Sequence, residues 1–249
     1  PEVILHFAAH AADPTEKDEA GMLMHTVLPL LHVVLGCQRL KNLKALINAG
    51  SSSEYGQQHV PMHAQLLPNP NSSHSVAKCA QTLYARYAAS FYDLPVLTLR
   101  FFSNYGPYEQ PRRFIPRLLR AALTGKTVNL SQKATPRDFV FVTDTLKAVE
   151  KATQIAAEHR GAVYNLGTGV QHTLEQVVEL VQKIHGSKIA VSWGSKPPNK
   201  WDSPVWVADM QYTARHFSPE AFTPLLQGLT QTYQWFRDNL ARYPIYLSG

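Results

Sequence analysis

Short apolar runs of strand length alternate with segments of helical periodicity, and this alternation restricts the fold more than any other feature of the sequence. The apolar runs cover residues 3–8, 43–49, 95–102 and 162–167. Helical segments between them cover residues 21–40, 72–92 and 144–156. Strands that alternate with helices indicate a parallel sheet joined by helical crossovers. The sequence therefore predicts an α/β fold.

The alternation loosens after "NYGP" at residues 104–107. The later segments are a basic helix over 114–123, a short strand over 127–130, a helix over 173–185, a strand over 188–193 and a closing helix over 224–241. A parallel α/β sheet binds ligands at the carboxyl ends of its strands. Polar residues that directly follow strands are therefore candidate site residues: Ser51, Ser52, Ser53, Ser103 and Asn104.

Composition excludes several classes of protein. The 249 residues are 45% hydrophobic, enough for one large core or two smaller ones. We find no stretch that approaches the roughly 18 to 20 uncharged apolar residues of a membrane-spanning helix, and no signal sequence. Cys37 and Cys79 lie in helical patterns rather than in a disulfide framework or a metal-binding pair. We expect a cytoplasmic protein with no metal site and no membrane partner.

The net charge of +6 does not by itself indicate nucleic acid, because the basic residues are scattered and are not interleaved with aromatic residues. One basic concentration stands out, formed by Arg112, Arg113, Arg117 and Arg120. It is either a solvated helix face or an anion site for a phosphorylated small molecule. A local cluster suits a diphosphate better than a duplex, so we expect no nucleic-acid partner.

Five motifs occur in a fixed order: "GSSSEYG", "PNSSHSVAK", "LRFFSNYGP", "RDFVFVTD" and "YNLGTG". In this order they resemble the extended short-chain dehydrogenase/reductase family, in its NAD-dependent nucleotide-sugar epimerase/dehydratase branch. The resemblance implies a Rossmann-like parallel sheet with a small C-terminal α/β substrate domain. It assigns residues 1–110 and 138–168 to the dinucleotide-binding part. Residues 111–137 and 169–249 fall in the substrate-binding part.

The resemblance also implies a catalytic set. In the family a serine or threonine and a Tyr-x-x-x-Lys pair surround the reacting sugar carbon. Here Ser51 matches the hydroxyl position, Lys78 matches the lysine, and His74 stands where the tyrosine would be. Histidine titrates near 6.5 and is already suited to proton exchange near neutrality, whereas tyrosine titrates near 10. A lysine ammonium one helical turn away would favour neutral His74.

Three interpretations of His74 stay open: a working base, an impaired or altered enzyme, and a non-catalytic nucleotide-sugar-binding protein. An isolated surface histidine is the alternative without a function. The dehydratases have an Asp-Glu pair where this chain has Ser52 and Ser53, and Glu54 would face the other side of a continuing strand. The sequence therefore favours an NAD(P)-dependent epimerase or 4-ketoreductase over a dehydratase.

The resemblance extends to the substrate, a nucleotide-diphosphate sugar. Arg137 matches a diphosphate-binding position, although a salt bridge to Asp138 is its alternative. Lys200 falls where relatives often have a second arginine. The other predicted substrate contacts are Ser52, Ser53, Ser103 and Asn104. His25 is the nearest match to a family asparagine that faces the lysine through water, but a buried structural histidine is the alternative.

The cofactor implied is NAD or NADP, contacted by Ala8, Ala9, Lys78 and Arg100. The GxGxxG turn that holds the pyrophosphate is not in this sequence. Either the sequence is a fragment, which we favour, or the natural protein is short and binds NAD differently; intact mass distinguishes the two. Because relatives commonly dimerise through two helices, including the one that carries the lysine, a homodimer is also expected.

Overall fold

Four parallel strands form the main sheet, in the order β1-β2-β4-β8. Their bounds are Val3–His6 for β1, Ala45–Ser51 for β2, Val96–Phe101 for β4 and Val163–Leu166 for β8. The structure is a computed structural model that describes residues 1–10, 18–195, 201–216 and 221–246. The predicted α/β fold with a parallel sheet is confirmed.

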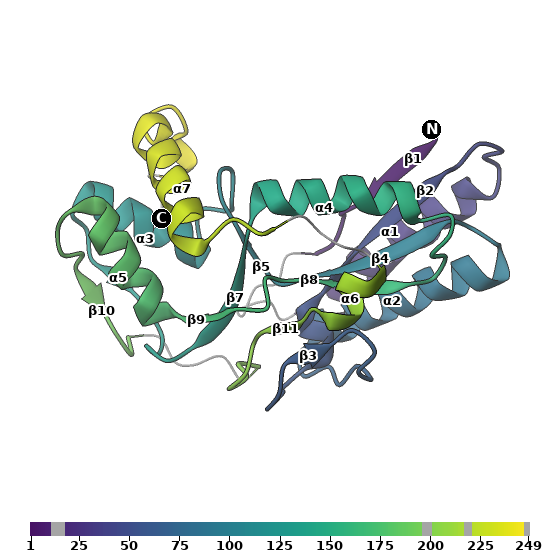
Figure 1. The fold of residues 1–249 in the computed structure, drawn as a ribbon, viewed down its shortest axis with the longest axis horizontal. Coiled ribbons are helices and arrows are strands. Elements are labelled where there is room, and N and C mark those ends of the chain that lie inside the picture. The colour runs from purple at the N-terminus through teal and green to yellow at the C-terminus, as the bar shows by residue number, and fades with distance from the viewer. Residues whose placement is uncertain (11–17, 196–200, 217–220, 247–249) are drawn as a thin grey trace.

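Helices cover both faces of this sheet (Figure 1). Helices α1 (Glu19–Cys37) and α2 (Ser73–Phe91) pack on one face, and α4 (Val142–Ile155) packs on the other. Successive residues of a strand point to opposite faces, so Leu46 of β2 packs with α1 and α2 while Ile47 packs with α4. Burial on both faces explains why the strands are almost continuously apolar.

Local capping explains where α2 begins. Its N-cap is Ser72, whose hydroxyl accepts a hydrogen bond from the backbone N–H of Ser75. The Ser75 hydroxyl in turn accepts a hydrogen bond from the backbone N–H of Ser72. These bonds satisfy backbone groups that the first helical turn leaves unpaired. The helix start is thereby specified by its own residues, and it places His74 in the first turn.

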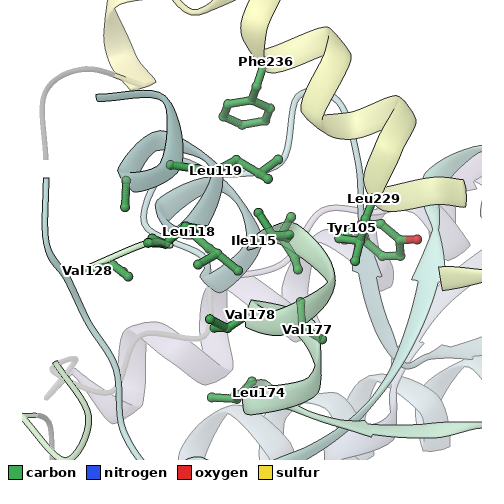
Figure 2. Packing of buried hydrophobic residues seen from close by; sticks show 14 of the residues in the cluster. Tyr105, Ile115, Leu118, Leu119, Val128, Leu174, Val177, Val178, Leu229 and Phe236 are labelled. Carbon is green, nitrogen blue, oxygen red and sulfur yellow. The ribbon is translucent and has the colours of Figure 1, made fainter. Parts of the chain in front are cut away.

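A second hydrophobic core lies in the lobe on the left of Figure 1, away from the main sheet. It packs α3 (Phe114–Thr124), α5 (Leu174–His185) and α7 (Leu225–Asn239) around residues such as Ile115, Val177 and Phe236 (Figure 2). A small sheet of β5 (Ser103–Tyr105), β7 (Pro136–Phe141) and β9 (Gln171–Thr173) connects this lobe to the main sheet. Tyr105, Phe139 and Phe141 of this small sheet belong to the hydrophobic core of the lobe. The predicted domain boundaries stay a prediction.

The remaining elements are short. They are the 3₁₀ turns η1 (Ser52–Tyr55) and η2 (Pro244–Tyr246), the strands β3 (Met62–His63), β6 (Val128–Asn129), β10 (Val191–Ser192) and β11 (Ala208–Asp209), and the helix α6 (Gln211–His216). The expected longer helices and strands end within a few residues of the observed ones. The sequence pattern did not predict β3, β9, β11 or α6, because elements of two to six residues are too short to show a period.

Helix α1 corrects one expectation. Its 19 residues are long and apolar enough to cross a membrane, with a mean hydropathy of 1.7 and a third of the window buried. The expectation that no stretch approaches this composition was wrong, because the run from Ala20 to Cys37 contains no Asp, Glu, Lys or Arg. Core helices can have the same composition, and α1 buries Leu30 and Val34 against α2 and the sheet.

Candidate functional site

A pocket of about 240 Å³ opens where β2 and β4 end. Most of its polar lining comes from the serine turn after β2, the first turn of α2, and the strands β5 and β7. The lining residues are Met22, Ser51, Ser52, Ser53, Asn71, Ser72, Ser73, His74, Phe101, Phe102, Ser103, Arg113, Arg137, Trp201 and Trp206. This is the edge of an α/β sheet at which ligands are expected to bind.

Ser51 ends β2 and caps the 3₁₀ turn η1. Its hydroxyl oxygen accepts from the Ser53 N–H at 3.1 Å and lies 2.8 Å from the Ser53 hydroxyl. The turn folds back because the Glu54 carboxylate accepts from the Ser51 N–H at 2.8 Å. The three predicted serines therefore lie together in the pocket wall, and Ser51 has a defined orientation.

His74 lies in the same pocket wall, in the first turn of α2. Burial lowers the pKa of His74 to about 4, and the positive charges of Lys78 and Arg113 and the neighbouring His10 act in the same direction. Its Nδ1 is buried and has no hydrogen-bond partner among the described residues. The imidazole is therefore neutral at pH 7 and able to accept a proton.

Lys78 lies one helical turn further along α2 but is not one of the pocket-lining residues described. Its ammonium donates to the Ala49 carbonyl of β2 at 2.8 Å and to Gln81 Oε1 at 2.9 Å. Burial lowers the pKa of Lys78 to about 8, partly opposed by the Glu54 carboxylate. The structure thus brings Ser51 and His74 to one wall, with Lys78 behind it.

Arg100 does not occupy the position predicted for a cofactor contact. It is 4% exposed, and its guanidinium donates to the Glu54 carboxylate at 2.8 Å, and to the Tyr55 hydroxyl and the Ala64 carbonyl, each at 3.1 Å. These contacts give Arg100 a structural role. Glu54 also differs from expectation: because β2 ends at Ser51 and a 3₁₀ turn follows, its side chain points into the interior.

Arg137 lies in the pocket wall as predicted for a substrate contact. Its guanidinium donates to the Asp202 carboxylate at 2.6 Å and stacks 4.8 Å from the centre of the Trp206 ring. The alternative of a salt bridge to Asp138 is wrong, because Asp138 accepts instead from Thr168, Gly169 and Ala208. Two contacts with residues distant in sequence, Asp202 and Trp206, therefore hold the Arg137 guanidinium in place.

The other predicted polar contacts separate in the structure. Ser103 lines the pocket, but the side chain of Asn104 accepts a hydrogen bond from Thr145 of α4 at 3.0 Å, outside the lining set. The substrate contact predicted for Asn104 is therefore not supported. Lys200 lies outside the described residues. His25 is exposed and stacks with His10. It therefore fits neither the suggested contact with the lysine nor the alternative of a buried structural histidine.

The arginine cluster also divides. Arg113 lines the pocket with a side chain that is 54% exposed. Arg117 donates to the Asn129 carbonyl, and Arg120 donates to the Tyr246 carbonyl at 3.3 Å. Of the four arginines, only Arg113 belongs to the described pocket lining.

Comparison with known proteins identifies the fold family. Residues 1–167 match the family model described as the NAD dependent epimerase/dehydratase family. The chain belongs to this family. The match covers the main sheet, η1 and α2, and therefore the segment that carries Ser51, His74 and Lys78.

Several members of the family resemble the chain over most of its length. UDP-glucuronate 4-epimerase 2 of Arabidopsis thaliana is 26% identical over 94% of this chain, which spans 58% of that protein. The structure titled as MoeE5 in complex with UDP-glucuronic acid and NAD has a TM-score of 0.87 and 30% identity, covering 96% of this chain and 80% of its own. UDP-glucuronic acid 4-epimerase from Bacillus cereus, solved with UDP-glucuronic acid and NAD, has a TM-score of 0.88 at 22% identity and covers 95% of this chain and 76% of its own.

The family is NAD-dependent, and some residues present here fit one end of that cofactor. Lys78 has three ammonium donors, of which two have described protein partners, leaving one for a ribose hydroxyl. Ala8 and Ala9 follow β1 at the same sheet edge, and their cofactor contact stays a prediction. The Lys78 ammonium therefore fits a ribose hydroxyl. The described residues include no glycine-rich pyrophosphate turn.

Among the pocket residues that sequence reasoning missed are Trp201 and Trp206, whereas Arg113 belongs to the basic cluster for which an anion site was one alternative. The buried indole N–H of Trp206 has no described hydrogen-bond partner, so it is a free donor at the pocket. A signal was available, since the "PNKWD" segment chosen for Lys200 also contains Trp201 and the Asp202 that binds Arg137.

Proposed function

We propose that this chain carries the catalytic site of an NAD(P)-dependent nucleotide-sugar epimerase or 4-ketoreductase. One observation carries the proposal: Ser51 and neutral His74 share a pocket wall, and Arg137 lies in the wall of the same pocket. A hydroxyl, a proton acceptor and a guanidinium are the groups required to hold a sugar hydroxyl, take its proton and bind a diphosphate.

In the proposed reaction, Ser51 hydrogen-bonds the reacting sugar oxygen and His74 exchanges its proton. Because the pKa of His74 is about 4, its imidazole accepts this proton without first losing one at neutral pH. The Lys78 ammonium holds the nicotinamide ribose and favours neutral His74. The nicotinamide, when bound, accepts and returns a hydride at the sugar carbon.

Diphosphate binding rests on Arg137 and Arg113. Arg137 is held by Asp202, so a diphosphate would approach a guanidinium that is already oriented but partly neutralised. Arg113 adds a second, more exposed positive charge to the same pocket. The pocket is smaller than the roughly 300 Å³ at the lower end of typical ligand sites. We therefore expect it to hold the sugar and diphosphate, with the nucleoside beyond these walls.

The competing proposal is a nucleotide-sugar-binding protein without catalysis. An imidazole is shorter than a phenol, so its nitrogen would lie an ångström or two further from the sugar, and small displacements are costly in proton and hydride transfer. The unpartnered Nδ1 of His74 supports this alternative, since no described neighbour orients the ring through it. Turnover is therefore the property that separates the two functions.

The test uses a panel of UDP- and dTDP-sugars with NAD and with NADP, and it follows sugar products by mass spectrometry. We expect wild-type turnover, a His74→Tyr variant that keeps or raises it, and a His74→Ala variant slower by about 100-fold or more, as for loss of a general base. His59→Ala is the matched control, because His59 is an exposed histidine outside the pocket lining and outside α1 and α2, and its variant should match the wild type.

Calorimetric titration with UDP accompanies the assay. UDP binding with no turnover by wild type or His74→Tyr would establish the binding protein instead. Arg137→Ala should weaken UDP binding whether the protein is an enzyme or a binding protein. If the wild type does not bind UDP, both proposals are contradicted.

We also propose a cytoplasmic homodimer. The outer faces of α1 and α2 expose apolar side chains, Leu23, Met24, Leu28 and Leu35 on α1 and Val76, Leu83, Tyr87 and Phe91 on α2. An apolar surface of this extent on two packed helices is typical of an interface with a second copy.

The buried free thiols of Cys37 and Cys79 fit a reducing compartment such as the cytoplasm.

A further inference from the structure

Gln81 is a fully buried polar residue one helical turn after Lys78 on α2. A buried carboxamide destabilises a protein unless its hydrogen-bonding groups are paired. The contacts of Gln81 therefore indicate what the residue does at this place.

The Gln81 side chain joins three elements of the fold. Its Oε1 accepts from the Lys78 ammonium at 2.9 Å. Its Nε2 donates to the Thr26 carbonyl of α1 at 3.0 Å and, more weakly, to the Ala8 carbonyl after β1 at 3.4 Å. Reversing the amide would point N–H groups at an ammonium and an oxygen at two carbonyls. Only one orientation is chemically possible.

This arrangement restricts the Lys78 ammonium. Gln81 and the Ala49 carbonyl take two of its three N–H groups, and these acceptors lie on different elements, α2 and β2. The third N–H is left with a direction defined by the other two. Without Gln81, the four-carbon lysine chain would have one described anchor and could rotate about it.

The bridge also connects Lys78 to α1. Exposed His25 does not reach the lysine, whereas the next residue, Thr26, is buried and presents its carbonyl to Gln81. A bound water can bridge two polar groups of this kind. Here a carboxamide side chain makes the connection directly.

We propose that Gln81 is a positioning residue that holds the Lys78 ammonium in place for the cofactor ribose by bridging it to the Thr26 carbonyl. This inference rests on the proposed function for its catalytic consequence. Its structural core, the control of the lysine by the carboxamide, is independent of any turnover.

The direct test measures the pKa of Lys78 by NMR in protein labelled with carbon-13 at the lysine ε position. The signal is assigned by its loss in Lys78→Arg. Gln81→Leu removes an acceptor from the ammonium and should lower the Lys78 pKa by about one pH unit, the tenfold change that a lost hydrogen bond to a charged group gives. Gln81→Glu places a carboxylate there and should raise the Lys78 pKa.

Thr232→Val is the matched control. Thr232 on α7 is as fully buried as Gln81, but its hydroxyl donates to the Gly228 carbonyl and contacts neither Lys78 nor Glu54. We expect this variant to leave the lysine pKa unchanged while costing comparable stability in thermal unfolding. If Gln81→Leu does not fold, the opposite displacement in Gln81→Glu carries the test.

An unchanged Lys78 pKa in folded Gln81 variants, or an equal change in Thr232→Val, would overturn the proposal. Activity then separates this result from the proposed function. In an active wild type, Gln81→Leu should lower kcat at least tenfold and move the alkaline limb of the pH profile downward. If the pKa responds as expected but the wild type converts no nucleotide sugar, the positioning role stands and the catalytic function fails.

Discussion

In the proposed site, His74 would supply different chemistry from the tyrosine of the family motif. Tyrosine must lose a proton to act as a base, and its pKa must fall from near 10 for that to occur at neutral pH. A histidine needs no such activation, and burial with nearby positive charge keeps it neutral from about pH 4 upward. The same charges limit its use as an acid, because the imidazolium is disfavoured until a substrate proton arrives.

The depressed pKa of His74 has a consequence for stability. Between pH 6.5 and about 4 the unfolded chain binds a proton at this histidine and the folded chain does not, so stability falls as pH falls through that window. At pH 4.5 the loss from this residue is about 2 to 3 kcal/mol. His74→Asn should therefore lose less stability than the wild type between pH 7 and pH 4.5.

Urea unfolding at the two pH values measures this difference. His59→Asn is the control for the removal of an exposed histidine outside the pocket and outside α1 and α2. Equal pH dependence in wild type and His74→Asn would show that the His74 ring is not held neutral in the folded protein.

At the scale of elements, the turn after β2 and the carboxyl end of β4 form one unit. The Glu54 carboxylate binds the Ser51 N–H, the Thr82 hydroxyl and Arg100, so it joins η1, α2 and β4. Both ionic side chains are almost inaccessible to solvent. The position of Ser51 in the pocket therefore depends on an ion pair beneath it rather than on the serine motif alone.

Glu54→Ala should destabilise the fold by about 3 to 5 kcal/mol, because it leaves Arg100 buried and unpaired. Chemical denaturation measures the loss. The control is Glu175→Ala, which removes the exposed ion pair with Lys133 and should cost less than about 1 kcal/mol. Similar losses for the two variants would mean that water reaches Arg100.

At the scale of the whole molecule, residues at the ends of the main sheet and residues of the small sheet line one pocket, and α1 and α2 present an apolar face to the outside. That face explains the hydropathy of α1 without a bilayer, provided that a second copy covers it. Helix α2 belongs to both surfaces. Its first turn lines the polar pocket, and its exposed apolar side chains belong to the apolar face.

We expect light scattering to give twice the 27.9 kDa chain mass, and Leu83→Glu to give the monomer. A charge at this exposed α2 position would be buried unpaired in the interface. Leu67→Glu is the control, because Leu67 is 87% exposed and belongs to neither helix. A monomeric wild type, or one that sediments with phospholipid vesicles, would contradict the dimer.

Much of this structure follows from local patterns. Apolar runs and helical periods predicted the parallel sheet and the larger helices, and motif order predicted that Ser51 and His74 share a site. These properties depend on neighbouring residues: Ser72 caps α2 through Ser75, three residues away. Such signals act within a few residues and are therefore readable along the chain.

The partners of the charged groups were decided by tertiary structure. Arg100 meets Glu54 across 46 residues, and Arg137 meets Asp202 across 65. Gln81 meets Thr26 across 55 residues. A buried charge or amide takes whichever partner the packing brings within about 3 Å, and nothing local specifies that partner. The residues present set the chemistry available here, while the packing of sheet and helices determined which groups face the pocket and which stabilise the interior.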